Sequence, residues 1–405
     1  MGFQFQFPAS ILKGKSMKKK FSRRDLLGTM TAGAVSAAAA SVFPKAHFAM
    51  AQDVSPSASA QTPASAQTPA SALNVNPAGR PIYGDPRIRG PFPILSTPYR
   101  EDGTVDFDVL ARSAQFVDWC GSPGMIWPQS GDSLDLLTMK EKLEGMEALA
   151  DAMKGRKSAL CLGVQGRNTE EMLIYARHAE KLDVPCIISR PPDDGKTQED
   201  MRDYWRALAK VTNRPVILQT TGGTTYRGPA PSVELLIDLA KGSPWFGYVK
   251  EEAANTWQRM KLLIEAKPAI KTVFSAWGGF AWLHQSRLGT EGLITERAVY
   301  ADLLAKIWDF MEREDRVKAA DAFSRLLMML NLKETIPCNQ LRGFHLYVWM
   351  KRGIFKNMIS REYGPKNAIP EKPILREMKL TDDAVAEIDS RFEALRPYLR
   401  EGTFT

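Results

Sequence analysis

The sequence predicts an α/β fold, a (β/α)8 TIM barrel followed by a C-terminal helical extension. From Gly90 onward, short apolar runs alternate with amphipathic segments, and eight such runs can be counted. This alternation over about 220 residues is what a closed barrel of parallel strands requires. The alternative, an open doubly wound sheet, would carry a Gly-rich phosphate loop after its first strand. The segment Ser96-Thr97-Pro98-Tyr99 is no such loop.

The eight apolar runs are expected to form the barrel strands, within a domain that spans residues 90–312. Short, continuous apolar runs are typical of strands that are buried on both faces. In order, they are Phe92 to Thr97, Met125 to Gln129, Ala159 to Val164, Cys186 to Ser189, Val216 to Gln219, Phe246 to Lys250, Thr272 to Ser275 and Gly292 to Thr295.

Between these runs, apolar residues recur at helical spacing, and polar residues or Pro and Gly separate the segments. The clearest predicted helices are Asp106 to Trp119, Met139 to Met153, Thr169 to Leu182, Gln198 to Val211 and Ser232 to Ala240. Residues 313–405 continue with apolar residues at helical spacing and end in a predicted helix from Thr381 to Leu395. We interpret this extension as packing helices or a subunit interface, and we expect no cofactor.

Residues 1–51 are predicted to be a twin-arginine export signal rather than part of the fold. The pair Arg23-Arg24 lies in a basic stretch ahead of an Ala-rich segment, and Ala49-Met50-Ala51 is a small-x-small cleavage site. A membrane anchor is the weaker alternative, because residues 26–40 are short and mildly apolar compared with the ~20 residues that a span needs. We therefore expect a periplasmic protein with no membrane contact after signal removal.

Residues 52–89 are predicted to be a disordered linker, because repeats of Ala-Gln-Thr-Pro-Ala-Ser leave almost nothing apolar to bury. The signal also carries most of the net charge: residues 1–51 contain eight Lys or Arg and one Asp, which is +7 of the formal +8. The rest of the chain is nearly neutral and has no basic stripe interleaved with aromatic residues. We therefore expect no nucleic-acid partner.

The cysteines and histidines are too scattered to predict a metal site. No Cys-x-x-Cys or His-x-His motif occurs, so we expect no metal, and the cysteines are interpreted as core thiols. The cysteines, and the histidines beyond the signal, are Cys120, Cys161, Cys186, Cys338, His178, His284 and His345.

Lys250 is the strongest candidate for a catalytic residue. It closes the sixth apolar run and is followed by Glu251 and Glu252. A lysine at the end of a buried strand is unfavourable unless the site uses its amine, because desolvation disfavours the ammonium. In such barrels the reacting groups lie at the carboxyl ends of the strands, which makes Lys250 a candidate Schiff-base lysine. The alternative is a surface lysine that pairs with Glu251 or Glu252.

Two other strand ends carry candidate substrate-binding residues. The second strand ends in Gln129-Ser130-Gly131-Asp132, whose amide, hydroxyl and backbone donors suit a carboxylate. An ordinary strand-to-helix turn with a capping Ser or Asp is an equal alternative. The fifth strand ends at Gln219, and Arg227 on the following loop could clamp an acidic substrate through two hydrogen bonds.

Over roughly Gly90 to Leu395, the chain resembles the dihydrodipicolinate synthase and N-acetylneuraminate lyase family. Residues 93–103 resemble the family opening, in which Thr-Pro-Phe is followed by Asp-Gly. Ser130-Gly131-Asp132-Ser133 falls where the family has its Gly-Thr-Thr-Gly-Glu loop, and Tyr248-Val249-Lys250-Glu251 matches its Gly-Ile-Lys-Glu motif.

The resemblance implies class I aldolase chemistry without metal or cofactor. Lys250 would condense with the ketone of pyruvate or another 2-keto acid, and the protonated imine would act as an electron sink. Gln129 and Ser130 stand where the family's loop threonines hold the keto-acid carboxylate, and Arg227 approximates its substrate-binding arginine. The resemblance also implies a homo-oligomer, either a tetramer or a dimer.

One departure from the family changes the expected proton transfer. The family ends its fifth strand in Tyr-Asn, with the tyrosine as a proton relay, whereas this chain has Gln219-Thr220. Glutamine transfers no proton usefully near neutral pH. The period of two places Tyr248 on the same strand face as Lys250, so Tyr248 is a candidate replacement. Tyr226 and Tyr99 are its rivals, and simple cavity filling is the other interpretation.

We therefore expect a Schiff-base-forming lyase, an aldolase or a dehydratase, that acts on a 2-keto acid. Trp127 and Trp277 near strand ends predict an aromatic mouth and an aromatic or bulky aldehyde as second substrate. Biosynthetic dihydrodipicolinate formation is not expected, because lysine precursors are made in the cytoplasm. A non-catalytic barrel that binds a small acidic metabolite is the alternative. A sugar-phosphate aldolase would need a phosphate site, which Gly278-Gly279 and Gly289-Thr290 match only faintly.

Overall fold

The computed structural model describes residues 74–336 and 344–404. The predicted export signal, most of the predicted linker and Cys338 lie outside these residues. Within the described part of the chain, no helix combines the length and the apolar character needed to span a bilayer.

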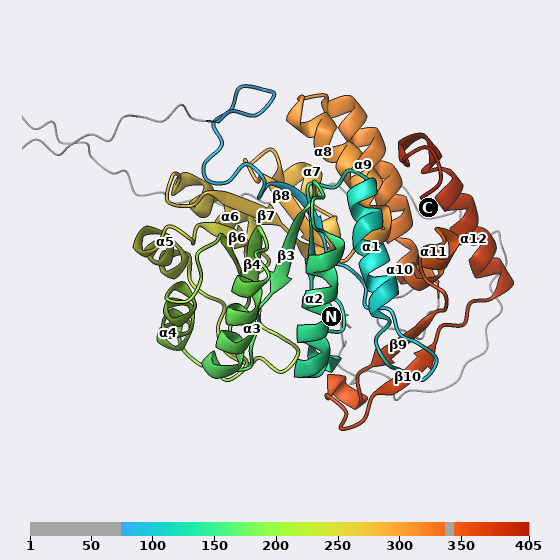
Figure 1. Cartoon of the computed structure of the whole chain (residues 1–405). Coiled ribbons are helices and arrows are strands. Elements are labelled where there is room, and N and C mark those ends of the chain that lie inside the picture. The colour runs from blue at the N-terminus through green and yellow to red at the C-terminus, as the bar shows by residue number, and fades with distance from the viewer. Residues whose placement is uncertain (1–73, 337–343, 405) are drawn as a thin grey trace, which may run out of the picture. The chain divides into compact units, whose positions relative to one another are not determined.

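Eight parallel strands form a nearly closed barrel with helices between them, which confirms the predicted fold class (Figure 1). The ring is completed between the first two strands by a parallel bridge of Ile94 and Ile126. The Ile126 carbonyl also accepts a hydrogen bond from the backbone N–H of Leu95 at 3.0 Å. The strands are β1 (Gly90–Pro93), β2 (Gly124–Trp127), β3 (Ala159–Gly163), β4 (Cys186–Ser189), β5 (Val216–Gln219), β6 (Tyr248–Lys250), β7 (Thr272–Ser275) and β8 (Gly292–Thr295).

The first five barrel helices begin where the sequence supplies capping side chains. Asp106, Thr138, Asn168, Thr197 and Ser232 each accept a hydrogen bond from the backbone N–H three residues later. Such caps satisfy N–H groups that have no partner within the helix. The helices are α1 (Phe107–Trp119), α2 (Met139–Ala152), α3 (Thr169–Lys181), α4 (Gln198–Ala209), α5 (Val233–Gly242), α6 (Thr256–Glu265), α7 (Trp282–Gln285) and α8 (Ala301–Glu312).

Alternate strand residues form two separate cores, because successive side chains of a strand point to opposite faces. Inward residues such as Ile126, Cys161 and Ile217 fill the barrel. Outward residues pack against the helices, as Trp127 does. A Cβ on Gly145 of α2 would lie 2.2 Å from the Trp127 ring, so the helix approaches the strand closely only because residue 145 is glycine.

Residues 74–89 are packed against the barrel, so the prediction of a disordered linker up to residue 89 is wrong for this part. Ile82 and Ile88 are buried. Asn76 Nδ2 donates to Glu312 Oε1 at 3.1 Å, and the Asp85 N–H donates to the Tyr248 hydroxyl at 2.8 Å. These apolar and hydrogen-bonding side chains follow the Ala-Gln-Thr-Pro repeats, and they provide the burial that the repeats lack.

The extension contains the predicted helices and also an antiparallel hairpin that the sequence analysis did not predict. Its helices are α9 (Arg316–Leu330), α10 (Leu332–Thr335), α11 (His345–Lys351) and α12 (Asp382–Glu393), and its strands are β9 (Ile359–Glu362) and β10 (Ile374–Glu377). Arg352, after α11, binds Asp302 of α8 at 2.6 Å, with both side chains buried. The extension is thereby fixed to the last helix of the barrel (Figure 1).

Arg361 of β9 joins the hairpin to the loops at the carboxyl ends of the strands. Its Nη1 donates to the Leu136 carbonyl and to Glu141 Oε2, each at 2.9 Å, and its Nη2 donates to the Gly103 carbonyl at 2.9 Å. Gly103 follows β1, Leu136 follows β2 and Glu141 lies in the first turn of α2, so one guanidinium connects the extension to two segments at the carboxyl end of the barrel.

Candidate active site

Lys250 is buried at the carboxyl end of β6, with 4% of its surface exposed. Its Nζ lies 3.3 Å from Glu252 Oε2. The alternative interpretation of a surface lysine therefore fails on burial, although its expected pairing with a neighbouring glutamate is present. A buried amine beside a carboxylate at the catalytic end of a barrel is a suitable nucleophile position.

Glu252 is held by the end of the neighbouring strand. Thr221 Oγ1 donates to Glu252 Oε1, and Gln219 Nε2 donates to Thr221 Oγ1 at 3.1 Å. Gln219 is also the direct register partner of Lys250 across the β5 and β6 pair. The structure thus brings together two predicted site residues, Gln219 and Lys250, and adds Thr221 and Glu252 to them.

Glu251 points away from this group and has a structural role. Its Oε2 binds Arg259 at 3.0 Å, and its Oε1 accepts hydrogen bonds from Thr220 Oγ1 at 2.9 Å and from the Ala253 N–H at 2.8 Å. The side chain is fully buried. The two adjacent glutamates therefore have different roles: Glu251 stabilises the loop after β6, and Glu252 faces Lys250.

The loop after β2 is organised by Asp132. Its carboxylate accepts a hydrogen bond from the Thr97 N–H at 3.1 Å and another from the Thr97 hydroxyl. The same hydroxyl accepts from Trp127 Nε1 at 2.9 Å. Gly131 has a φ of +92°, a conformation that favours glycine. Asp132 therefore joins the ends of β1 and β2, which fixes the loop that carries Gln129 and Ser130.

Arg190 is a site residue that the sequence analysis missed. It follows β4 directly and is 3% exposed. Its Nη1 donates to Ser130 Oγ at 2.9 Å, and its Nη2 binds Asp135 at 2.6 Å and Asp193 at 3.3 Å. A Cβ on Gly223 would lie 2.1 Å from this guanidinium, so a larger residue at that position would have to displace it.

The two carboxylates on Arg190 differ in their electrostatics. Burial alone would raise the pKa of Asp135, but the Arg190 guanidinium outweighs it and lowers that pKa below its ordinary value. For Asp193, burial prevails over the attraction of Arg190 and raises the pKa. Asp135 is thus the principal counter-ion of Arg190.

The C-terminal hairpin adds a tyrosine to the same region. The Tyr363 hydroxyl accepts a hydrogen bond from Thr224 Oγ1 at 3.4 Å, and the Thr224 N–H donates to Asp135 at 3.4 Å. Burial raises the pKa of Tyr363 to about 12. Tyr363 follows β9, so the extension contributes to the loop cluster after β2, β4 and β5.

Four buried side chains at or just after the ends of β2, β3, β4 and β5 carry polar atoms with no hydrogen-bond partner among the described residues. The atoms are Gln129 Nε2, both amide atoms of Gln165, Arg190 Nε and Gln219 Oε1. Gln165 lies two residues beyond Gly163, on the inward face of β3. Unpartnered buried polar groups are unfavourable, and they are common where a ligand completes the hydrogen bonds.

Tyr248 does not have the position that its predicted role requires. Its side chain is inside the barrel, as predicted, but its hydroxyl accepts the Asp85 N–H, and Asp85 precedes β1 at the amino end of the barrel. Lys271, which precedes β7, also lies over the ring, at 5.3 Å from its centroid. The prediction that the Tyr248 hydroxyl replaces the missing relay is therefore wrong, because the ring points away from Lys250.

The rival tyrosines are also held elsewhere. The Tyr226 hydroxyl donates to the Pro229 carbonyl at 2.6 Å, within its own loop. Tyr99 is buried beneath Arg361, whose guanidinium lies 4.9 Å from the ring centroid.

Arg227 is exposed, and its Nη1 donates to the carbonyls of Thr224 and Tyr226, each at 2.8 Å. The contacts of Arg227 thus lie in its own loop. Arg190, in contrast, joins Ser130 to the carboxylates of Asp135 and Asp193.

The two tryptophans of the predicted aromatic mouth have different surroundings. Trp127 faces the outer core and is fully buried against α2. Trp277 is 46% exposed. Trp127 therefore contributes nothing to a mouth, whereas Trp277 follows β7 at the carboxyl end of the barrel, and an aromatic second substrate stays a prediction.

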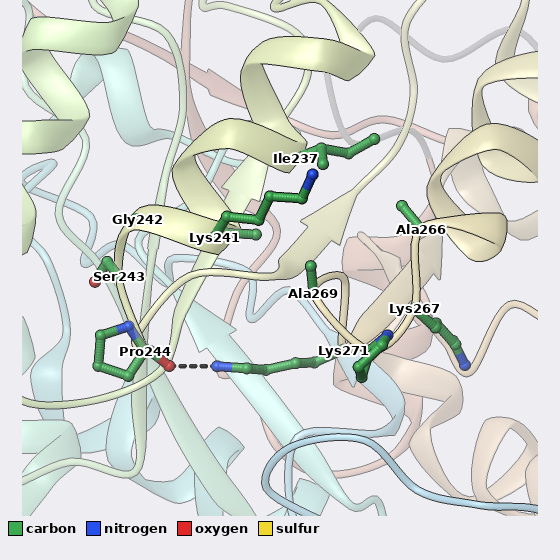
Figure 2. A pocket seen from close by; sticks show the side chains of 11 residues that line it. Ile237, Lys241, Gly242, Ser243, Pro244, Ala266, Lys267, Ala269 and Lys271 are labelled. Atoms are coloured by element: carbon green, nitrogen blue, oxygen red, sulfur yellow. Dashed lines mark hydrogen bonds between the residues drawn. The ribbon is translucent and has the colours of Figure 1, made fainter. Parts of the chain in front are cut away.

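A hollow of about 830 Å³ lies between the end of α5 and the segment before β7 (Figure 2). It is lined by Lys241, Pro244, Lys267 and Lys271, among others. Pro244 precedes β6 and Lys271 precedes β7, so this hollow is at the amino end of the barrel, opposite Lys250. It is not part of the candidate active site.

Comparison with known families agrees with this geometry. Residues 87–337 match the model of the Dihydrodipicolinate synthetase family. The chain belongs to this family. The 4-hydroxy-tetrahydrodipicolinate synthase of Chlorobaculum parvum is 26% identical over 254 residues, which cover 62% of this chain and 84% of the relative. The corresponding synthase of Chlorobium chlorochromatii is 27% identical over 258 residues, with 62% and 85% covered.

Solved structures show the same fold. N-acetylneuraminate lyase from Fusobacterium nucleatum has a TM-score of 0.64 at 17% identity, with 78% of this chain and all of that chain covered. Dihydrodipicolinate synthase from Aquifex aeolicus has a TM-score of 0.63 at 18% identity, with the same coverage. A prophage protein of the family from E. coli, solved in complex with pyruvate, has a TM-score of 0.60 at 17% identity, with 76% and 99% covered. Family membership supports a lyase of the class I, pyruvate-type aldolase kind.

Proposed function

We propose that the protein is a Schiff-base-forming lyase in which the Lys250 amine condenses with the ketone of a 2-keto acid. The observation that carries this proposal is the position of Lys250, buried at the carboxyl end of β6 and next to a carboxylate. The family match places the chain among pyruvate-type lyases, and a solved member of the same fold binds pyruvate. The protonated imine would withdraw electrons during cleavage or formation of a C–C or C–O bond.

The loop after β2 is the proposed binding site for the keto-acid carboxylate. Ser130 carries a hydroxyl that is bonded to Arg190, so negative charge at Ser130 would be stabilised by that guanidinium. Gln129 adds an amide N–H group with no partner among the described residues. Gly131 gives the loop its turn, and Asp132 fixes it to Thr97.

The remainder of the substrate is proposed to be polar rather than aromatic. Gln165 and Gln219 provide buried amide atoms that lack partners, and an amide can both donate and accept. A chain of hydroxyl groups or a second carboxylate would satisfy these atoms, whereas an aromatic ring would leave them unpaired. We therefore expect a hydroxylated or dicarboxylic 2-keto acid to be the better substrate.

Incubation with pyruvate and borohydride tests the proposal. Intact mass should increase by one reduced pyruvyl group in the wild-type protein and in Lys142→Met, but not in Lys250→Met. Lys142 is the matched control, because it is also buried and burial lowers its pKa, but it lies on α2. An adduct that persists in Lys250→Met would contradict the proposed nucleophile.

A non-catalytic barrel that binds a small acidic metabolite is the second candidate. It is favoured by one observation, the ion pair that already engages the Lys250 amine with Glu252. In that case, calorimetry would detect keto-acid binding to the wild-type protein, while borohydride would trap no adduct with pyruvate or with hydroxylated keto acids.

We also propose that the protein is exported by the twin-arginine route and acts in the periplasm as a homo-oligomer. The support is the Arg23-Arg24 signal in the sequence and, for assembly, the family resemblance alone. Cell fractionation of the wild type and of an Arg23→Lys, Arg24→Lys variant tests export, since the variant should remain cytoplasmic. Light scattering of the purified protein tests assembly, and a monomer would contradict it.

A further inference from the structure

Glu252 occupies a position from which it can exchange protons with the reacting nitrogen. Its Oε2 lies 3.3 Å from Lys250 Nζ, and the two side chains are 14% and 5% exposed. The other carboxylate oxygen, Oε1, accepts the Thr221 hydroxyl, which in turn accepts from Gln219 Nε2 at 3.1 Å. One oxygen is therefore anchored by the loop after β5, while the other faces the amine.

No phenol has an equivalent position in the described contacts of Lys250. The hydroxyl of Tyr248 is at the amino end of the barrel, that of Tyr226 is bonded to Pro229, and that of Tyr363 accepts from Thr224. Gln219, where the family has a relay tyrosine, holds no transferable proton near neutral pH. A carboxylate is the group on this side of Lys250 that can both accept and return a proton.

From this geometry we infer that Glu252 is the catalytic acid and base for imine formation at Lys250. The inference rests on the proposed function, because it assigns a role within the Schiff-base reaction. It also explains why the chain needs no tyrosine at residue 219: the proton transfers are carried out from the loop after β6, two residues after the nucleophile.

The sequence of proton transfers is balanced. Glu252 takes one proton from the Lys250 ammonium, and the nitrogen lone pair of the resulting amine attacks the ketone carbon as the C=O π electrons move to oxygen. The carboxylic acid of Glu252 returns its proton to that oxygen, which gives a hydroxyl. The resulting carboxylate then removes a second proton from the nitrogen. Finally it protonates the hydroxyl, the C–O bond breaks, and water leaves as the nitrogen lone pair forms the protonated imine. Glu252 ends as the carboxylate with which it began.

The test compares rates of imine formation rather than final yields. Wild type, Glu252→Gln and Glu252→Ala are mixed with pyruvate, quenched with borohydride at successive times and weighed as intact protein. General acid and base catalysis typically contributes 10²–10⁴-fold, so both variants should form the adduct at least about 100-fold more slowly. Added formate should accelerate the Glu252→Ala variant, whose truncation leaves room for it, and not the Glu252→Gln variant.

The outcomes separate this inference from the proposed function. If the wild type forms no adduct with any 2-keto acid, the proposed function fails, and the role of Glu252 fails with it. If the wild type forms the adduct and Glu252→Gln forms it at the same rate, the proposed function stands and the inference is overturned. Should the Gln and Ala variants not fold, Glu252→Met decides, since it retains much of the side-chain volume and has no titratable group: a rate reduced at least about 100-fold supports the role, and the wild-type rate overturns it.

Discussion

Replacing Arg190 with methionine should destabilise the protein by about 3–5 kcal/mol. Removal of one partner from a buried ion pair leaves an uncompensated charge, and losses of this size are typical. Arg190 is 3% exposed and binds two carboxylates, Asp135 at 2.6 Å and Asp193 at 3.3 Å, which are themselves largely buried. Methionine preserves much of the side-chain volume, so the loss reports mainly on the charges. The upper part of the range is expected, because two carboxylates remain.

Urea unfolding followed by tryptophan fluorescence measures this loss, and a second substitution tests its cause. In the Arg190→Met background, Asp135→Asn should restore stability, whereas in the wild-type background the same change should reduce it. Such opposite effects are expected of residues in direct contact. Arg190→Lys is the matched control and should be intermediate, since it retains the charge but not the forked geometry. An Arg190→Met variant within about 1 kcal/mol of wild type, as at exposed pairs, would refute the reasoning.

Three further predictions follow from particular contacts. Tyr248→Phe should lower the free energy of unfolding by about 1–3 kcal/mol, because the Asp85 N–H loses its acceptor. Trapping of pyruvate by borohydride should be unchanged in this variant. Loss of trapping in the folded variant would instead support Tyr248 as the proton relay. Gln165→Leu removes two buried polar atoms without partners, so the free energy of unfolding in urea should be unchanged or rise by up to about 1–3 kcal/mol. Calorimetry should show weaker binding of the keto acid. A large loss of stability would mean that the Gln165 amide has hydrogen-bond partners. Burial would raise the pKa of Glu141, but the hydrogen bond and charge of Arg361 outweigh burial and lower that pKa below 4.5. The ion pair therefore adds to stability above pH 4.5, and this contribution is lost as the pH falls through the lowered pKa. When the pH is lowered, the urea midpoint should accordingly fall less in Glu141→Gln than in the wild type. An identical fall in both proteins would contradict a contribution of the Glu141–Arg361 pair to stability.

Much of the fold could be predicted because its signals are local. The strands of Cys186–Ser189, Val216–Gln219 and Thr272–Ser275 have the predicted bounds, since apolar runs between polar turns mark them directly. The hairpin of β9 and β10 could not be predicted in the same way. Its second strand, Ile374–Glu377, is exposed, so it lacks the continuous apolar run that marks a buried strand.

The candidate site was predictable in part. Lys250 was found because a charge closes an apolar run, and Arg190 after Ile187-Ile188-Ser189 carries the same signal, which the sequence analysis overlooked. The position of Tyr248 shows a limit of periodicity. A period of two gives the face of a strand, but two residues are also ~6.6 Å along it, and a long side chain can point to either end. Tyr363 lies more than a hundred residues after Lys250, and its approach to Thr224 depends on tertiary packing that no local pattern encodes.

Peptide mapping of the borohydride-reduced pyruvate adduct tests the central claim most directly. After proteolysis and tandem mass spectrometry of the wild-type protein, we expect the reduced pyruvyl group on the peptide that contains Tyr248-Val249-Lys250, attached to the Lys250 side chain. An adduct on Lys142 or on another lysine, with Lys250 unmodified, would contradict the account.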